Sequence, residues 1–247
     1  MVLPVDVVDH IFSFLREDLA TLKLCIQAHP LLSGIAERHL YHTTNLDIKY
    51  GCDLDITQLS SLLEKNPRIR NYIRSLEINI SNSAKSLVSA QTPVIKALSS
   101  ILSSLPCLNK VTLTLSNLSW TITHTTFRTP FINILQQSSV TEVHLESIYA
   151  FPLFVLNACQ NIKTLSLSNC EDFKRFELTP SSHHLESLSI RSSDSLGLFG
   201  WAINRIGSLT SLKLRPENME FSALPKLLEA CAASLTSLEL DMDDLGG

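Results

Sequence analysis

One short phrase recurs along most of this chain: an aliphatic residue, two residues of any kind, a second aliphatic residue, one residue, and a third aliphatic residue. The clear copies begin 22 to 35 residues apart, and a weaker copy with Thr43, Leu46 and Ile48 precedes them. In each clear copy a polar residue separates the last two aliphatic residues, which is the period of a strand with one buried face. The clear copies begin at Ile73, Leu108, Val140, Ile162, Leu185, Leu209 and Leu235.

Apolar segments of helical length lie between most of these copies. One strand with one helix or loop cannot bury its apolar side alone, whereas stacked copies can, so the spacing predicts a solenoid. The stretch 171–184 is the exception, because Thr179, Pro180, Ser181 and Ser182 indicate an irregular connection. The segments that we expect to be helical are 93–105, 131–137, 152–159, 197–206 and 221–231.

The copy at 162–170 reads I-K-T-L-S-L-S-N-C, which fits the phrase L-x-x-L-x-L-x-x-N/C. From about residue 70 to its end the chain resembles the leucine-rich-repeat family. The resemblance implies an α/β solenoid over 43–247, with a parallel sheet on its concave face. No further copy follows Leu240, although a solenoid needs a capping element at its end. We therefore expect an array that is either shortened or incomplete at Gly247.

A doubly wound α/β enzyme also alternates strands and helices, so it is the competing interpretation. Such an enzyme carries a glycine-rich loop between a strand and a helix, but this chain has only seven glycines and no such loop. Strands buried on both faces are also continuously apolar, whereas these strands have polar alternate positions. Both features favour the solenoid.

The first forty residues follow a helical pattern instead. Leu3-Pro4 suits the first turn of a helix, where proline needs no N–H partner. Asp18 is a candidate N-cap for a second helix over 19–27, and a third helix is expected over 31–41 after Pro30. The first helix should be apolar around most of its circumference, because it carries Val7, Val8, Ile11, Phe12, Phe14 and Leu15. A helix of that kind is buried in its own fold or in a partner.

Residues 3–15 read L-P-V-D-V-V-D-H-I-F-S-F-L, and 18–25 read D-L-A-T-L-K-L-C. The first segment resembles the opening of an F-box, L-P-x-E-I-L-x-x-I-F-S-Y-L, with Asp6 in place of glutamate. The second is similar to the form common among fungal F-box proteins, while the aromatic residue of the third F-box segment is absent around 29–31. The resemblance assigns an F-box-like helical module to 1–42.

An F-box followed by leucine-rich repeats implies a substrate-recognition subunit of a cullin-RING (SCF-type) ubiquitin ligase. The F-box would dock on the Skp-family adaptor of the ligase, and the repeats would bind a protein target. Two alternatives remain: a helical cap that seals the solenoid, and a repeat scaffold that binds a protein partner without a ligase link. The residues that align with the adaptor interface, or with the positions beneath it, are Leu3, Pro4, Val8, Ile11 and Leu15.

The polar residues between the aliphatic ones should form rows across successive strands. One row would run Glu77, Thr112, His144, Ser166, Ser189, Lys213, Glu239, and the next Asn79, Thr114, Glu146, Ser168, Arg191, Arg215, Asp241. Arg191, Lys213 and Arg215 would then cluster and could bind an acidic or phosphorylated segment of a target. The alternative is a solvated face on which these cations pair with neighbouring acids.

Several classes of function are not expected. A formal net charge of −4 argues against a nucleic-acid partner, and no run of apolar residues is long enough to span a membrane. Six scattered cysteines without a C-x-x-C pair suit reduced thiols in the cytoplasm or nucleus, and the start of the chain does not resemble a signal peptide. His39 and His42 have metal-ligand spacing but no third ligand. We therefore expect no metal, no cofactor, no catalytic residues and no enzyme activity.

Overall fold

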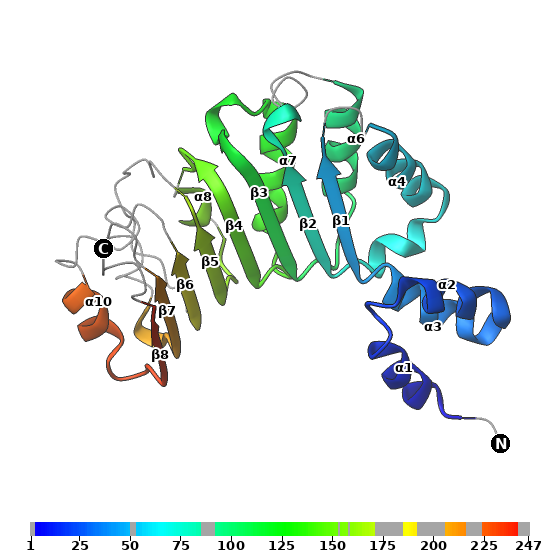
Figure 1. The fold of residues 1–247 in the computed structure, drawn as a ribbon, viewed down its shortest axis with the longest axis horizontal. Coiled ribbons are helices and arrows are strands. Elements are labelled where there is room, and N and C mark those ends of the chain that lie inside the picture. The colour runs from blue at the N-terminus through cyan, green and yellow to red at the C-terminus, as the bar shows by residue number, and fades with distance from the viewer. Residues whose placement is uncertain are drawn as a thin grey trace.

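The computed structural model describes residues 3–49, 53–84, 92–152, 154–157, 159–170, 185–191, 206–215 and 224–241. It shows an α/β protein with one open sheet of eight strands, preceded by three helices. Figure 1 shows the strands side by side along an arch, with α4 (Asp53–Lys65), α6 (Pro93–Leu102) and α7 (Thr125–Leu135) on its outer side. The helix α1 (Val5–Ser13) and the last strand lie at opposite ends of that arch.

Every copy of the aliphatic phrase forms a strand, including the weak copy at Thr43. All neighbouring strands are parallel, and their order in the sheet follows the chain. The order does not reverse, as it does in a doubly wound sheet. The strands are β1 (Thr43–Ile48), β2 (Ser75–Ile80), β3 (Lys110–Ser119), β4 (Glu142–Tyr149), β5 (Thr164–Ser168), β6 (Ser187–Arg191), β7 (Ser211–Arg215) and β8 (Ser237–Leu240).

The register aligns the same position of the phrase in every strand. The middle aliphatic residues pair in order from β2 to β8, and those of β2 to β7 have no exposed surface. Side chains of one strand alternate between the two faces, so this register keeps all the aliphatic residues on the same face of the sheet. That row is Leu76, Val111, Val143, Leu165, Leu188, Leu212 and Leu238.

Helices follow most of the strands, and three of the expected segments contain one. The segment 93–105 contains α6, 152–159 contains α8 (Phe154–Asn157), and 221–231 contains α10 (Leu224–Cys231). The connection 171–184 lies outside the described residues, as does 197–206 apart from Ile206, where the short helix η4 (Ile206–Ser208) begins. The other short helices are η1 (Pro67–Asn71), η2 (Asn82–Ala84) and η3 (Trp120–Ile122).

The sequence pattern indicated no helix between the copies at Thr43 and Ile73, and Asp53 suited a loop, yet α4 begins at Asp53. The helix is polar for much of its length, which hides its apolar side in the sequence. Ile56 and Leu63 are nevertheless buried in the core of the sheet, and Leu59 packs against it. Their separations of three and four residues place them on one face of a helix.

The helix expected over 131–137 begins earlier, at Thr125, and contains Pro130 in its interior. Interior proline costs about 3 kcal/mol in a helix, so the sequence pattern favoured a start after it. Here Phe127 and Phe131 flank the proline, are fully buried and stack on each other. Their burial offsets the missing backbone hydrogen bond.

The three N-terminal helices are those expected: α1, α2 (Leu19–Ala28) and α3 (Pro30–Leu40). Asp18 caps α2 as predicted, because its carboxylate accepts hydrogen bonds from the backbone N–H and the hydroxyl of Thr21 at 3.0 and 2.6 Å. His29 caps α3 by accepting from the N–H of Leu31 at 3.1 Å.

The helical part has a core of its own, separate from the core of the sheet. Phe12, Leu22, Ile35 and Ala36 form it, whereas one continuous cluster of buried residues runs from Leu46 to Cys231 through the sheet and its helices. Tyr41 and an ion pair between Arg68 and Glu37, at 3.0 Å, connect the helical part to the sheet.

Candidate functional site

Exposed hydrophobic side chains concentrate in the helical part of the molecule. Of the eleven large hydrophobic residues that are exposed in the described part of the chain, eight lie between residues 3 and 31. Many exposed apolar side chains in one small part of a folded protein are a reason to expect that this part contacts a partner. We call these eight the N-terminal apolar surface: Leu3, Val5, Val7, Ile11, Phe14, Leu19, Leu24 and Leu31.

The five residues expected at the adaptor interface divide into two groups. Leu3, Pro4 and Ile11 are exposed. Val8 and Leu15 are half-buried and pack against the small helical core instead. The structure therefore separates residues that a partner can contact from residues that support the helix from beneath.

Phe14 was not among those five residues, yet its side chain is 76% exposed, the highest value among the exposed large hydrophobics. It follows α1 directly, at the C-terminal cap, and its ring lies edge-on to His10 with the ring centroids 5.0 Å apart. An aromatic ring in this position is a favourable anchor for a protein partner. Its place in an apolar helical stripe was visible in the sequence, but its exposure was not.

A polar network holds α1 against α3 on the side facing the sheet. The Nε2 atom of the buried His39 hydrogen-bonds Asp9 of α1 at 3.0 Å, and its Nδ1 atom accepts from Nε of Arg16 at 3.1 Å. Arg38 also pairs with Asp9, at 3.3 Å. With Nδ1 accepting from Arg16, Nε2 is the nitrogen that donates to Asp9. These contacts fix the orientation of α1 and of its apolar surface.

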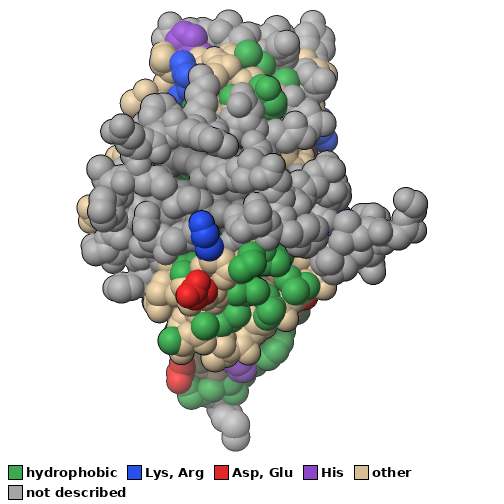
Figure 2. All heavy atoms as spheres, turned by 90° about the vertical axis from the view of Figure 1, so that its left-hand side faces the viewer, with side chains coloured by type: hydrophobic (Ala, Val, Ile, Leu, Met, Phe, Trp, Pro, Cys, Tyr) green, Lys and Arg blue, Asp and Glu red, His purple; other side chains and the backbone are tan. Residues whose placement is uncertain are grey.

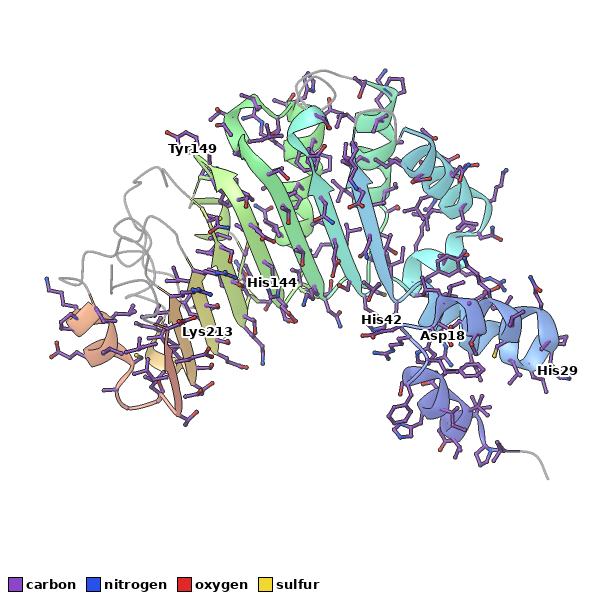
Figure 3. All side chains as sticks on the ribbon, in the orientation of Figure 1. Asp18, His29, His42, His144, Tyr149 and Lys213 are labelled. Carbon is purple, nitrogen blue, oxygen red and sulfur yellow. The ribbon has the colours of Figure 1, made fainter. Side chains whose placement is uncertain are left out.

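The polar face of the sheet carries the two predicted rows. The register pairs Glu77, Thr112, His144, Ser166, Ser189, Lys213 and Glu239 in order, and it confirms the neighbouring row from Asn79 to Arg215. The middle of this face is rich in hydroxyl groups, as expected. Figure 3 shows His144 and Lys213 on different strands of the sheet.

The three cations expected to bind a target do come together on adjacent strands. Arg191 pairs in register with Arg215, and Lys213 lies two residues before Arg215 on β7. Lys213 forms an ion pair with Glu239 at 2.6 Å, and Arg215 forms one with Asp241 at 3.4 Å. A target would have to compete with these two acids, so the assignment of Arg191, Lys213 and Arg215 to target binding stays a prediction.

A second charged group lies on the same face at β3 and β4. Glu142 receives Nζ of Lys110 at 2.8 Å and Nε2 of His144 at 2.6 Å on the same carboxylate oxygen. Burial raises the pKa of Glu142, but the hydrogen bonds from Lys110 and His144 outweigh it and hold the pKa below its ordinary value. The carboxylate therefore stays ionised and orients both partners across the face.

Among the described residues, no three side chains of metal-ligand type lie close enough together to hold an ion, and no helix is long and apolar enough to cross a membrane. His39 and His42 both line a cleft where the helical part meets the sheet.

A comparison of the chain with models of protein families and with curated proteins finds no match.

Proposed function

We propose that this chain is a substrate-recognition subunit of a cullin-RING ubiquitin ligase. Its helical part is an F-box-like module that docks on the Skp-family adaptor, and the rest is a leucine-rich-repeat solenoid that binds a protein target. The ligase's other subunits supply the catalysis, so the chain itself needs no catalytic residues. The protein works in the cytoplasm or the nucleus, where these ligases act.

The observation that carries the proposal is the N-terminal apolar surface. Residues 3–15, which resemble the opening of an F-box, contribute five of its eight side chains. Ile11 is 46% exposed and Phe14 is 76% exposed, although leaving such side chains in water is unfavourable. Docking on an adaptor would remove these side chains from water, which explains why the free chain exposes them.

The regular sheet supports the second half of the proposal. Strands in chain order, with the same phrase in the same register, are what stacked leucine-rich repeats produce. The two polar rows form an extended surface of hydrogen-bonding groups across neighbouring strands. Such a surface suits a protein target rather than a small molecule.

Binding of the purified chain to a purified Skp-family adaptor tests the proposal. Phe14→Ala should weaken the complex by about 2 kcal/mol, or roughly 30-fold, because truncating a central aromatic anchor is costly. Tyr149→Ala is the matched control, since Tyr149 is also an exposed aromatic residue (45%) but lies on β4, away from the helical part (Figure 3). Biolayer interferometry gives the affinities, and circular dichroism checks the folding.

The alternative function, a repeat scaffold with the helices as an end cap, also has support in the structure. Tyr41 packs on the core of the sheet, and Arg68 of η1 pairs with Glu37 of α3, as a cap requires. If the folded wild-type chain does not bind the adaptor, or if Phe14→Ala and Tyr149→Ala behave alike, the ligase proposal is wrong and the scaffold is favoured.

A further inference from the structure

A polar cleft of about 440 Å³ lies where the helical part meets the sheet. We propose that this cleft binds a phosphate group. Its walls come from α1 and α3 on one side and from the residues just before β1, β2 and β3 on the other. Figure 3 shows His42 at this junction, where β1 begins. None of the eight residues of the N-terminal apolar surface lines the cleft, so phosphate binding can be tested without the adaptor.

The charge of the cleft is opposite to that of the whole chain. Arg16, Arg38 and Arg74 line it together with only one carboxylate, Asp9, so it has an excess of two positive charges. The chain carries a formal net charge of −4. Three arginines therefore converge from α3, from the turn after α1 and from the residues before β2, where a single acid cannot neutralise them.

Each guanidinium is held in place by one nitrogen. Nε of Arg16 donates to His39, Nη1 of Arg74 donates to the carbonyl of Cys107 at 3.0 Å, and Nη2 of Arg38 pairs with Asp9. Guanidinium groups have five N–H donors, so each keeps several for a ligand. Side chains that are already oriented lose little freedom when a ligand binds.

His39 contacts one guanidinium and the carboxylate of the cleft at the same time. It is 6% exposed, and it receives Arg16 on one nitrogen while it donates to Asp9 on the other. Asp9 is thereby engaged by both His39 and Arg38. The one carboxylate of the cleft is thus already bound to two of the lining side chains, and the net charge of the lining stays positive.

The neutral lining groups can complete the coordination of an oxyanion. Tyr72, Asn71 and Asn109 contribute uncharged polar groups. Burial lowers the pKa of His42, and the positive charges of the neighbouring Arg16 and Arg74 lower it further. A neutral His42 can still donate one hydrogen bond to a ligand.

A phosphate monoester fits this arrangement better than other anions. It carries a charge of about −1.5 to −2 at pH 7, which matches the excess positive charge of the cleft, and guanidinium forks bind its oxygens in pairs. A single carboxylate would neutralise only half of that charge. The cleft is also larger than one phosphate group, so it has room for the part of the ligand that bears the phosphate.

Isothermal titration calorimetry of the full chain with inorganic phosphate tests the proposal. The variant Arg16→Gln/Arg38→Gln should bind phosphate at least about tenfold more weakly than the wild type, because two charge-assisted contacts are lost. The matched control is Lys49→Gln/Lys163→Gln, which also removes two exposed cations but lies outside the cleft. The control should bind as the wild type does.

Two outcomes would overturn the proposal: a wild-type chain that does not bind phosphate, or a double variant that binds within twofold of the control. If the double variant loses helical structure by circular dichroism, Arg16→Gln alone replaces it and should still weaken binding several-fold.

A short glycine-rich peptide with one phosphoserine, beside its unphosphorylated form, identifies the source of the phosphate. Tighter binding of the phosphopeptide than of inorganic phosphate indicates a polypeptide ligand, and equal binding indicates a small phosphate ester.

Discussion

The two ends of the parallel sheet carry the same aliphatic phrase but bury it to different degrees. At β1, Leu46 and Ile48 are 4% and 1% exposed, and they belong to one buried cluster with Ile56 and Leu63 of α4, against which Tyr41 packs. At β8, Leu238 and Leu240 are 46% and 44% exposed, and no element follows them among the described residues. Figure 2 looks onto this end and shows hydrophobic side chains gathered there. The aliphatic residues of a strand are thus buried by the element that follows the strand in the chain.

The largest effect expected from this difference is in Leu212→Ala. Leu212 and Leu238 are partners in the register, but Leu212 has no exposed surface. Truncating it should lower the free energy of unfolding by about 2 to 5 kcal/mol, through lost apolar burial and a cavity. Urea denaturation followed by circular dichroism measures the change.

Leu238→Ala is the matched change and should cost about 1 kcal/mol or less, because the side chain is already half exposed. Equal losses for the two variants would contradict the idea that the neighbouring element determines burial. They would also show that β8 is covered in solution.

Leu22→Ala should give the next largest effect, and one confined to the helical part. Leu22 is fully buried in the small core with Phe12, Ile35 and Ala36. We expect a loss near the lower end of the range for leucine truncation, about 2 kcal/mol, because a small core can collapse around the gap.

Hydrogen exchange of the backbone amides shows which part of the molecule Leu22→Ala destabilises. Because the two cores are separate, amides of α2 and α3 should lose protection while those of β4 and β5 keep theirs. A loss of protection spread equally over both parts would mean that they unfold as one unit.

A smaller effect is expected from Lys213→Met. Its ion pair with Glu239 joins β7 to β8, but the two side chains are 51% and 58% exposed. Exposed pairs contribute about 0 to 1 kcal/mol, so stability should change far less than in Leu212→Ala. Urea denaturation at low and high salt measures it, and a loss above about 2 kcal/mol would show that charge, not apolar contact, holds β8 to the sheet.

The smallest effect concerns the cap of α2 and depends on pH. Hydrogen bonds from Thr21 hold the pKa of Asp18 below its ordinary value of 3.8. The stabilisation is therefore complete above the unfolded-state pKa and is lost as the pH falls through the lower folded-state pKa. Protection of the α2 amides should fall in that acid range in the wild type.

Asp18→Asn keeps an oxygen that accepts the hydrogen bond but has no titrating group, so that part of the pH dependence should disappear. Asp55→Asn, an exposed acid on α4, is the control and should leave the pH profile of α2 unchanged. Identical profiles in the wild type and Asp18→Asn would show that another group controls the acid response.

Local patterns predicted the strands well and the helices less completely. The phrase identified all eight strands of the described residues, because alternation is a local property that each strand repeats. The helix at Asp53 was missed because its apolar side rests on few residues, and α7 was placed too late because Pro130 outweighed Phe127 in the pattern. In both helices, contacts with the sheet override local preference.

The candidate sites show the same division. Residues 3–15 identified the N-terminal apolar helix, but not that Phe14 is exposed while Phe12, two residues before it, is buried. The clustering of Arg191, Lys213 and Arg215 followed from the strand spacing. The sequence left open whether these cations bind a target or pair with acids, and the structure pairs Lys213 with Glu239 and Arg215 with Asp241.

The sequence alone determined the repeated strand, the order of apolar and polar positions, and the break between a helical start and the strands that follow. Each of these depends on residues close together in the chain. Only the tertiary structure decided which copies are buried and that Arg16, Arg38 and Arg74 line one cleft. Exposure and charge convergence depend on which distant elements become neighbours, and that is a property of packing rather than of local spacing.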